Sequence, residues 1–162
     1  MTLLISINTD NLKTLFFNPI FLSTAVTLCT AQILKTIICI LSGRKEKVRD
    51  LIEITIWRTG GMPSSHAAVV SAMTASVAFE EGIASNLFIF SFWFMLVVLR
   101  DALGVRRSAG LQARALNNLG RQISEKADIK FIPVKEIQGH TPLEVAVGIL
   151  LGIFIAAGIA LL

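Results

Sequence analysis

The sequence predicts an all-α integral membrane protein, a helical bundle of four spans plus one or two cytoplasmic interfacial helices. Two observations carry this prediction. Of the 162 residues, 54% are hydrophobic and only 16% are charged, which is outside the usual range of soluble proteins. The apolar residues also gather into four runs that are long enough to cross a bilayer, or nearly so. At this length we expect a single membrane-embedded domain, residues 1–162.

Four apolar runs define the expected spans. They cover Ile20–Leu41, Pro63–Phe79, Ile83–Leu99 and Leu143–Leu162. The first contains one charge, Lys35, and the last contains only Glu144, near its start. The two central runs have 17 residues each and are joined by the polar turn 80–82, so we expect a hairpin that crosses the bilayer twice.

The basic residues predict which side of the membrane each connection faces. Most of the 15 lysines and arginines fall between the first and second spans or between the third and fourth, and the turn 80–82 carries none. Because basic loops stay in the cytoplasm, both long connections are expected there and both termini outside. The expected location is a bacterial cytoplasmic membrane.

Both basic connections show helical patterns. From Arg107 onward an arginine recurs at every seventh position, and apolar residues lie roughly opposite. The apolar positions are Ala109, Leu116, Leu119 and Ile123. This pattern predicts an amphipathic helix lying on an anionic membrane surface. Segment 44–57 has a weaker pattern, for which a surface helix and a solvated basic connector are equally good interpretations.

In this topology every span brings polar residues to the cytoplasmic side. They are Lys35 about 9 Å before the end of the first span, His66 at the start of the second, Asp101 after the third and His140 at the start of the fourth. Ionisable side chains inside a membrane are typical of functional sites. Nothing in the hydropathy requires this coincidence, so we interpret it as one shared site.

The string from Gly60 to His66 is suited to binding an oxyanion. Its glycines allow close approach of the backbone, Pro63 is preorganised for the first helical position, and the hydroxyls of Ser64 and Ser65 accompany free amides at the positive helix end. An ordinary helix start has the same composition. His66 and the nearby arginines favour the oxyanion interpretation.

Glu144 has two interpretations. Thr141-Pro142-Leu143-Glu144 matches a capping box, in which the carboxylate binds backbone amides. Glu144 also follows His140 by four residues, close enough to hold one imidazole nitrogen and to turn the other toward a phosphorus atom. The sequence leaves both roles open.

In combination these motifs resemble a known superfamily. Pro63-Ser64-Ser65-His66 and His140-x-x-x-Glu144 are similar to the Pro-Ser-Gly-His and His-x-x-x-Asp motifs of the type 2 phosphatidic acid phosphatases and vanadium haloperoxidases. A small divergent branch of this superfamily resembles the chain more closely, from about Pro19 to Gly152. The matching strings are Gln32-x-x-Lys35, Gly60 to His66, Asp101-Ala102-x-Gly104-Val105-Arg106-Arg107, Gln112-Ala113, Leu116-Asn117 and Gly139-His140-Thr141-Pro142-x-Glu144-Val145.

The resemblance implies a phosphatase that acts on a membrane lipid phosphate without a metal or other cofactor. His140 would be the nucleophile that forms a phosphohistidine, Glu144 its orienting carboxylate, and His66 the acid that protonates the leaving oxygen. Fixed cations and donors would hold the substrate. The expected substrate-binding set is Lys35, Ser64, Ser65, Arg106, Arg107, Asp101 and Arg58.

The chain departs from the superfamily pattern in several places. Ser65 replaces the motif glycine, Glu144 replaces aspartate, and four spans replace a core of six helices. Lys35 also lacks the Arg-Pro that usually follows it, and Arg58 is the candidate for the missing cation. The alternative function is therefore a non-catalytic lipid-phosphate binding or transport protein.

The expected partners are a lipid phosphate substrate and membrane lipids, with no nucleic acid. A homodimer is an open alternative, because four spans enclose a pocket poorly.

Overall fold

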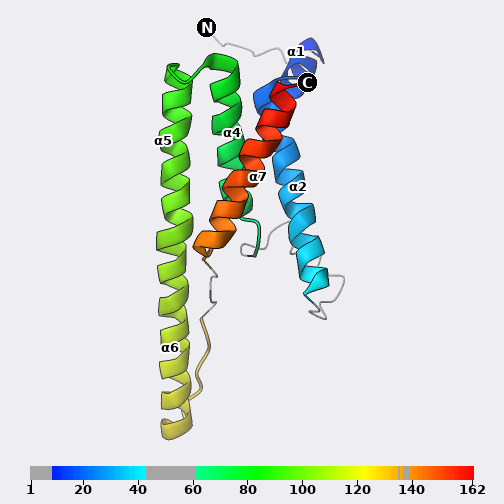
Figure 1. The fold of residues 1–162 in the computed structure, drawn as a ribbon. Coiled ribbons are helices and arrows are strands. Elements are labelled where there is room, and N and C mark those ends of the chain that lie inside the picture. The colour runs from blue at the N-terminus through cyan, green and yellow to red at the C-terminus, as the bar shows by residue number, and fades with distance from the viewer. Residues whose placement is uncertain (1–8, 43–60, 135, 137–138) are drawn as a thin grey trace.

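The structure is a computed structural model that describes residues 9–42, 61–134, 136 and 139–162. Within these ranges the chain is helical and has no strand. The elements are α1 (Thr9–Phe16), α2 (Pro19–Leu41), α4 (Ser65–Glu81), α5 (Asn86–Arg100), the π-helical η1 (Asp101–Val105), α6 (Arg106–Ala127) and α7 (Pro142–Ala160). Figure 1 shows α2, α4, α5 and α7 side by side, with successive helices running in opposite directions. The all-α prediction is confirmed.

The prediction of four spans is confirmed only in part. Three helices are long and apolar enough to cross a membrane: α2, the continuous helix 86–127, and α7. Helix α4 occupies the place of the expected second span, but its 17 residues extend only about 26 Å, short of a usual bilayer core.

The bundle exposes large apolar side chains and buries mainly small or polar ones. Phe90, Trp93 and Phe154 are exposed, whereas most of the buried residues of α4 are alanine, serine or threonine, including Ser71 and Ser76. Lipid is as apolar as a protein core, so membrane helices associate through small residues and polar contacts. This distribution fits a protein that is embedded in a membrane.

Helices α4 and α7 pack almost backbone to backbone. A Cβ atom added at Gly148 would lie 2.6 Å from the carbonyl oxygen of Ser64, and one at Gly152 would overlap the carbonyl oxygen of Ala68. These glycines form a Gly-x-x-x-Gly pattern, which lets two membrane helices approach closely. The contact brings the first turns of α4 and α7 together.

Helices α4 and α7 begin differently. Helix α7 starts as predicted, with Thr141 as the cap, Pro142 in the first turn and both bonds of the capping box present. Helix α4 starts at Ser65, because Ser64 adopts an extended conformation and its hydroxyl accepts the Ala67 N–H at 3.4 Å. Pro63 therefore precedes the cap, and the prediction that it opens the helix was wrong.

Helix α6 continues α5 through η1 and extends well beyond the rest of the bundle (Figure 1). It is followed by a turn at Asp128, whose φ of 52° is left-handed, and by a segment that returns along α6. The predicted helix on the membrane surface is not confirmed, because α6 shares the direction of a membrane span. The second candidate for a surface helix, 44–57, lies outside the described residues.

Candidate phosphate site

Four element ends meet at one end of the bundle. The backbone N–H of Ser64 donates to the carbonyl oxygen of Glu144 at 3.0 Å, which joins the starts of α4 and α7. Ala67, Ala102 and Val145 form a buried cluster that adds η1 to this junction. The last turns of α2 reach the same level through Lys35, described next.

Lys35 is buried against α4. Its side chain is 6% exposed, and its ammonium group donates a hydrogen bond of 2.9 Å to the hydroxyl of Ser65. A Cβ added at Gly61 would lie 3.8 Å from Cγ of Lys35, so this glycine passes close to the lysine stem, and its φ of 84° also favours glycine. The carboxylate of Glu144 attracts the ammonium electrostatically. A cation is thus fixed beside the loop before α4.

His140 and Glu144 form a second pair at the start of α7. His140 is 4% exposed, and its Nδ1 lies 3.1 Å from Oε2 of Glu144. The same Oε2 accepts the backbone N–H of Thr141 at 3.0 Å. The geometry therefore accommodates both interpretations of Glu144. An ionised carboxylate accepts a hydrogen bond from the Nδ1–H group, which leaves the free lone pair of the ring on Nε2.

His66 and Ser64 occupy contrasting positions. His66 follows Ser65 directly on α4 and its side chain is exposed, unlike that of His140. Ser64 is completely buried, and its hydroxyl serves as the helix cap. The structure thus gives Ser64 a structural role alongside the substrate contact expected from the sequence.

The remaining predicted residues lie in η1, at the start of α6 or before α4. Asp101 opens η1, and Arg106 and Arg107 are the first residues of α6. Their guanidinium groups lie outside the described part of the structure, as does the whole of Arg58. The described residues contain no group of three or more histidine, cysteine or acidic side chains able to hold a metal ion.

Asn117 is a polar residue with a role that sequence reasoning missed. It is 2% exposed; its Nδ2 donates to the carbonyl oxygen of Val134 at 2.9 Å, and its Oδ1 accepts the Val134 N–H at 2.8 Å. Nδ2 also donates to Glu136, which accepts a further bond from Arg114. These bonds hold the pKa of Glu136 below its usual value, and the bond from Asn117 has the largest effect. The segment leading to His140 is thereby fixed along α6.

The family match covers every residue of this site. Residues 16–155 match the family described as the divergent PAP2 family. A relative from Bacillus subtilis, named "Uncharacterized membrane protein YuiD", is 38% identical over 150 residues, which cover 86% of this chain and 92% of the relative. No solved structure matches the chain.

Proposed function

Since the chain belongs to the divergent PAP2 family, we propose that it is a metal-independent phosphatase that hydrolyses a membrane lipid phosphate through a phosphohistidine. One observation carries the proposal: the Lys35–Ser65 pair and the His140–Glu144 pair are joined by the Ser64–Glu144 backbone bond. A buried cation and an oriented imidazole at one level provide the two requirements of phosphoryl transfer, charge neutralisation and a nucleophile.

The proposed reaction has two steps. Nε2 of His140 attacks phosphorus, the N–P bond forms as the P–O bond to the lipid breaks, and His66 gives its proton to the leaving oxygen. Glu144 stabilises the positive charge that develops on the His140 ring through Nδ1. Water then attacks phosphorus, His66 takes its proton, and the N–P bond breaks to release phosphate and restore His140.

Lys35 is the centre of the proposed phosphate-binding set. Among the described residues Ser65 is the hydrogen-bond partner of its ammonium, which carries two further N–H donors. We assign these donors to phosphoryl oxygens. Ser64, Asp101, Arg106, Arg107 and Arg58 complete the proposed set.

We place the proposed site at the inner leaflet of a bacterial cytoplasmic membrane. The charge of the two long connections supports this placement, because they carry nearly all lysines and arginines of the chain. Both termini and the turn between α4 and α5 then lie outside. Lipid substrate would reach the site from the cytoplasmic leaflet.

The test is phosphate release by purified protein from phosphatidate, phosphatidylglycerophosphate and a prenyl diphosphate in mixed micelles. We expect turnover that survives chelators, is blocked by vanadate, and is lost in His140→Ala. The control is Glu80→Gln, at the opposite end of α4, which should keep full turnover. Turnover that needs added magnesium or manganese would contradict the mechanism.

The second candidate is non-catalytic binding or transport of a lipid phosphate. It is favoured by the Lys35–Ser65 pair, which is preformed and could hold a headgroup without any nucleophile. In that case the whole panel would show binding without phosphate release. Lys35→Met would abolish binding, whereas His140→Ala would leave it intact.

A further inference from the structure

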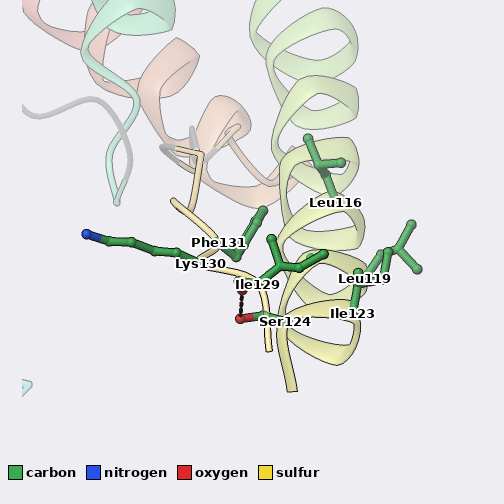
Figure 2. A pocket seen from close by; sticks show the side chains of 8 residues that line it. Leu116, Leu119, Ile123, Ser124, Ile129, Lys130 and Phe131 are labelled. Atoms are coloured by element: carbon green, nitrogen blue, oxygen red, sulfur yellow. Dashed lines mark hydrogen bonds between the residues drawn. The ribbon is translucent and has the colours of Figure 1, made fainter. Parts of the chain in front are cut away.

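Helix α1 is a short amphipathic helix immediately before the first span. Leu12, Leu15 and Phe16 are spaced by three and four residues, so they share one side of the helix, which we call the α1 apolar face. These side chains are 43%, 46% and 58% exposed. Thr14 falls on the opposite side. The main neighbour of α1 among the described helices is α2, which leaves the α1 apolar face largely uncovered. The other apolar surface of this kind, on α6, is already faced by the segment that returns along it, whose Phe131 lies beside Leu116 and Ile123 (Figure 2).

A bend separates α1 from α2. Asn18 is extended, with φ of −67° and ψ of 124°, and its Oδ1 caps α2 by accepting the N–H groups of Ile20 at 2.9 Å and Phe21 at 3.2 Å. The N–H of Asn18 donates to the carbonyl oxygen of Leu15 at 3.1 Å, which closes the last turn of α1. Because an extended residue interrupts the helix, α1 does not continue the axis of the span.

The short connection keeps α1 at the membrane surface. Only residues 17 and 18 lie between the two helices, and the three Cα steps from Phe16 to Pro19 span at most about 11 Å. The chain between Lys13 and Lys35 has no charged residue, so the apolar segment that enters the bilayer begins in the last turn of α1. The bilayer is therefore always beside α1.

A contact between two rings shows which way the α1 apolar face is turned. The rings of Phe16 and Phe21 meet edge to face, with centroids 5.4 Å apart and planes at 86°. Phe21 lies in the first turn of α2. The side of α1 that carries Phe16 is thus turned toward the beginning of the span, where exposed side chains such as Leu22 face lipid.

We propose that the α1 apolar face binds the membrane interface on the side opposite the candidate site, so that α1 is an interfacial anchor of the bundle (Figure 1). Amphipathic helices with leucine and phenylalanine on one face lie in this way at the boundary between headgroups and acyl chains. The covalent link to α2 keeps the effective concentration of bilayer around α1 high, so a small apolar area is enough. The anchor is independent of the proposed catalytic function.

The anchor also fixes the depth of the candidate site, a consequence that rests on the proposed function. Lys35 follows Pro19 by sixteen residues, about 24 Å along α2. With Pro19 held at one surface of a hydrocarbon core about 30 Å thick, Lys35 lies close to the other surface. The phosphate groups of membrane lipids lie near that level, where Lys35 can reach them.

Spin-label accessibility in liposomes tests the anchor. Cys29 and Cys39 are replaced by alanine, and one cysteine is introduced at a time for labelling. Labels at Leu12→Cys and Leu15→Cys should collide more often with oxygen, which concentrates in lipid, than with a water-soluble nickel chelate. Thr14→Cys is the matched control and should show the reverse. Equal accessibility of positions 14 and 15 would overturn the proposal. So would a label at 15 that is shielded from both reagents, because a protein would then cover the face.

Tryptophan fluorescence provides a second measurement with a smaller probe. In a background of Trp57→Phe and Trp93→Phe, the tryptophan of Leu15→Trp should be quenched by lipids brominated on the acyl chain. The tryptophan of Thr14→Trp should be quenched by acrylamide in the water instead. Quenching of both tryptophans by acrylamide alone would overturn the proposal. Neither measurement needs turnover, so failure of the proposed phosphatase activity leaves the test of the anchor intact.

Discussion

At the scale of single residues, one oxygen atom of Glu144 makes two contacts. Oε2 accepts the N–H of Thr141 and lies against Nδ1 of His140. The helix cap thus holds the carboxylate in place, and the carboxylate orients the imidazole. The same side chain contributes to the stability of α7 and to the proposed chemistry, and a suitable substitution can separate these contributions.

Glu144→Gln should fold normally and lose turnover. Glutamine replaces glutamate well in a capping box, so the unfolding temperature should change little. A neutral amide stabilises the imidazolium poorly, and the loss should be at least about a hundredfold, by analogy with orienting carboxylates in other histidine sites. Circular dichroism and phosphate release measure the two effects. A folded variant with nearly full turnover would reduce Glu144 to a cap.

His66→Ala should affect substrates according to their leaving group. If His66 protonates the leaving oxygen, its loss should slow hydrolysis of a lipid phosphate strongly and hydrolysis of an activated aryl phosphate weakly. The aryl oxide of the activated substrate is a good leaving group and departs without a proton. His140→Ala should abolish hydrolysis of both substrates, together with the covalent phosphoenzyme. The two rates are compared by steady-state assay. Equal loss on both substrates would refute the assignment of His66 as the acid.

At the scale of elements, the contact between α4 and α7 determines the geometry of the site. Gly148 and Gly152 allow the helices to approach, and the first turns then meet at the bond from Ser64 to Glu144. This pattern of two glycines is visible in the sequence. It predicts a helix pair only when the partner helix is known.

Gly152→Ala should destabilise the bundle by about 1–3 kcal/mol, because the added methyl overlaps the backbone of α4. Gly158→Ala is the matched control, since a Cβ there meets no atom within 4 Å. The control should leave the unfolding temperature unchanged or slightly raised. Thermal unfolding in detergent measures both variants. Equal effects would contradict the close contact of α4 with α7.

The returning segment should loosen from α6 in acid. The folded pKa of Glu136 lies below its usual value of 4.5, chiefly because of Asn117, so its stabilising contribution is present above that pH. It is lost as the pH falls through the lowered folded pKa. Hydrogen exchange in residues 128–134, corrected for intrinsic rates, should therefore rise in acid.

Variants of two glutamates provide the matched comparison. Glu136→Gln should raise exchange in residues 128–134 at pH 7, and its difference from the wild type should disappear in acid. Glu125→Gln, exposed on α6, should behave like the wild type throughout. Unchanged exchange in Glu136→Gln would show that Asn117 alone holds the segment.

At the scale of the whole molecule, the turn after α4 lies at the opposite end from the candidate site (Figure 1). With the site in the cytoplasm, Glu81→Cys in a cysteine-free background should react with a membrane-impermeant maleimide only from outside. Asp128→Cys should react only from the cytoplasmic side. The reverse pattern would contradict both the topology and the proposed inner-leaflet site.

The sequence by itself determined the features that depend on composition or on neighbours within one helical turn. A largely apolar composition gives the membrane class, since so many apolar side chains cannot be buried in a domain of this size. The Thr141–Glu144 capping box and the His140–Glu144 contact span three and four residues, distances that helix geometry fixes locally.

Only the tertiary structure decided the contacts between distant segments. The bond from Lys35 to Ser65 joins residues thirty positions apart. The two hydrogen bonds between Asn117 and the backbone of Val134 depend on a chain reversal after α6. Hydropathy gives neither the partner of a helix face nor the direction of a helix axis. The amphipathic pattern of α6 therefore predicted a helix on the membrane surface, whereas in the structure α6 continues the direction of α5.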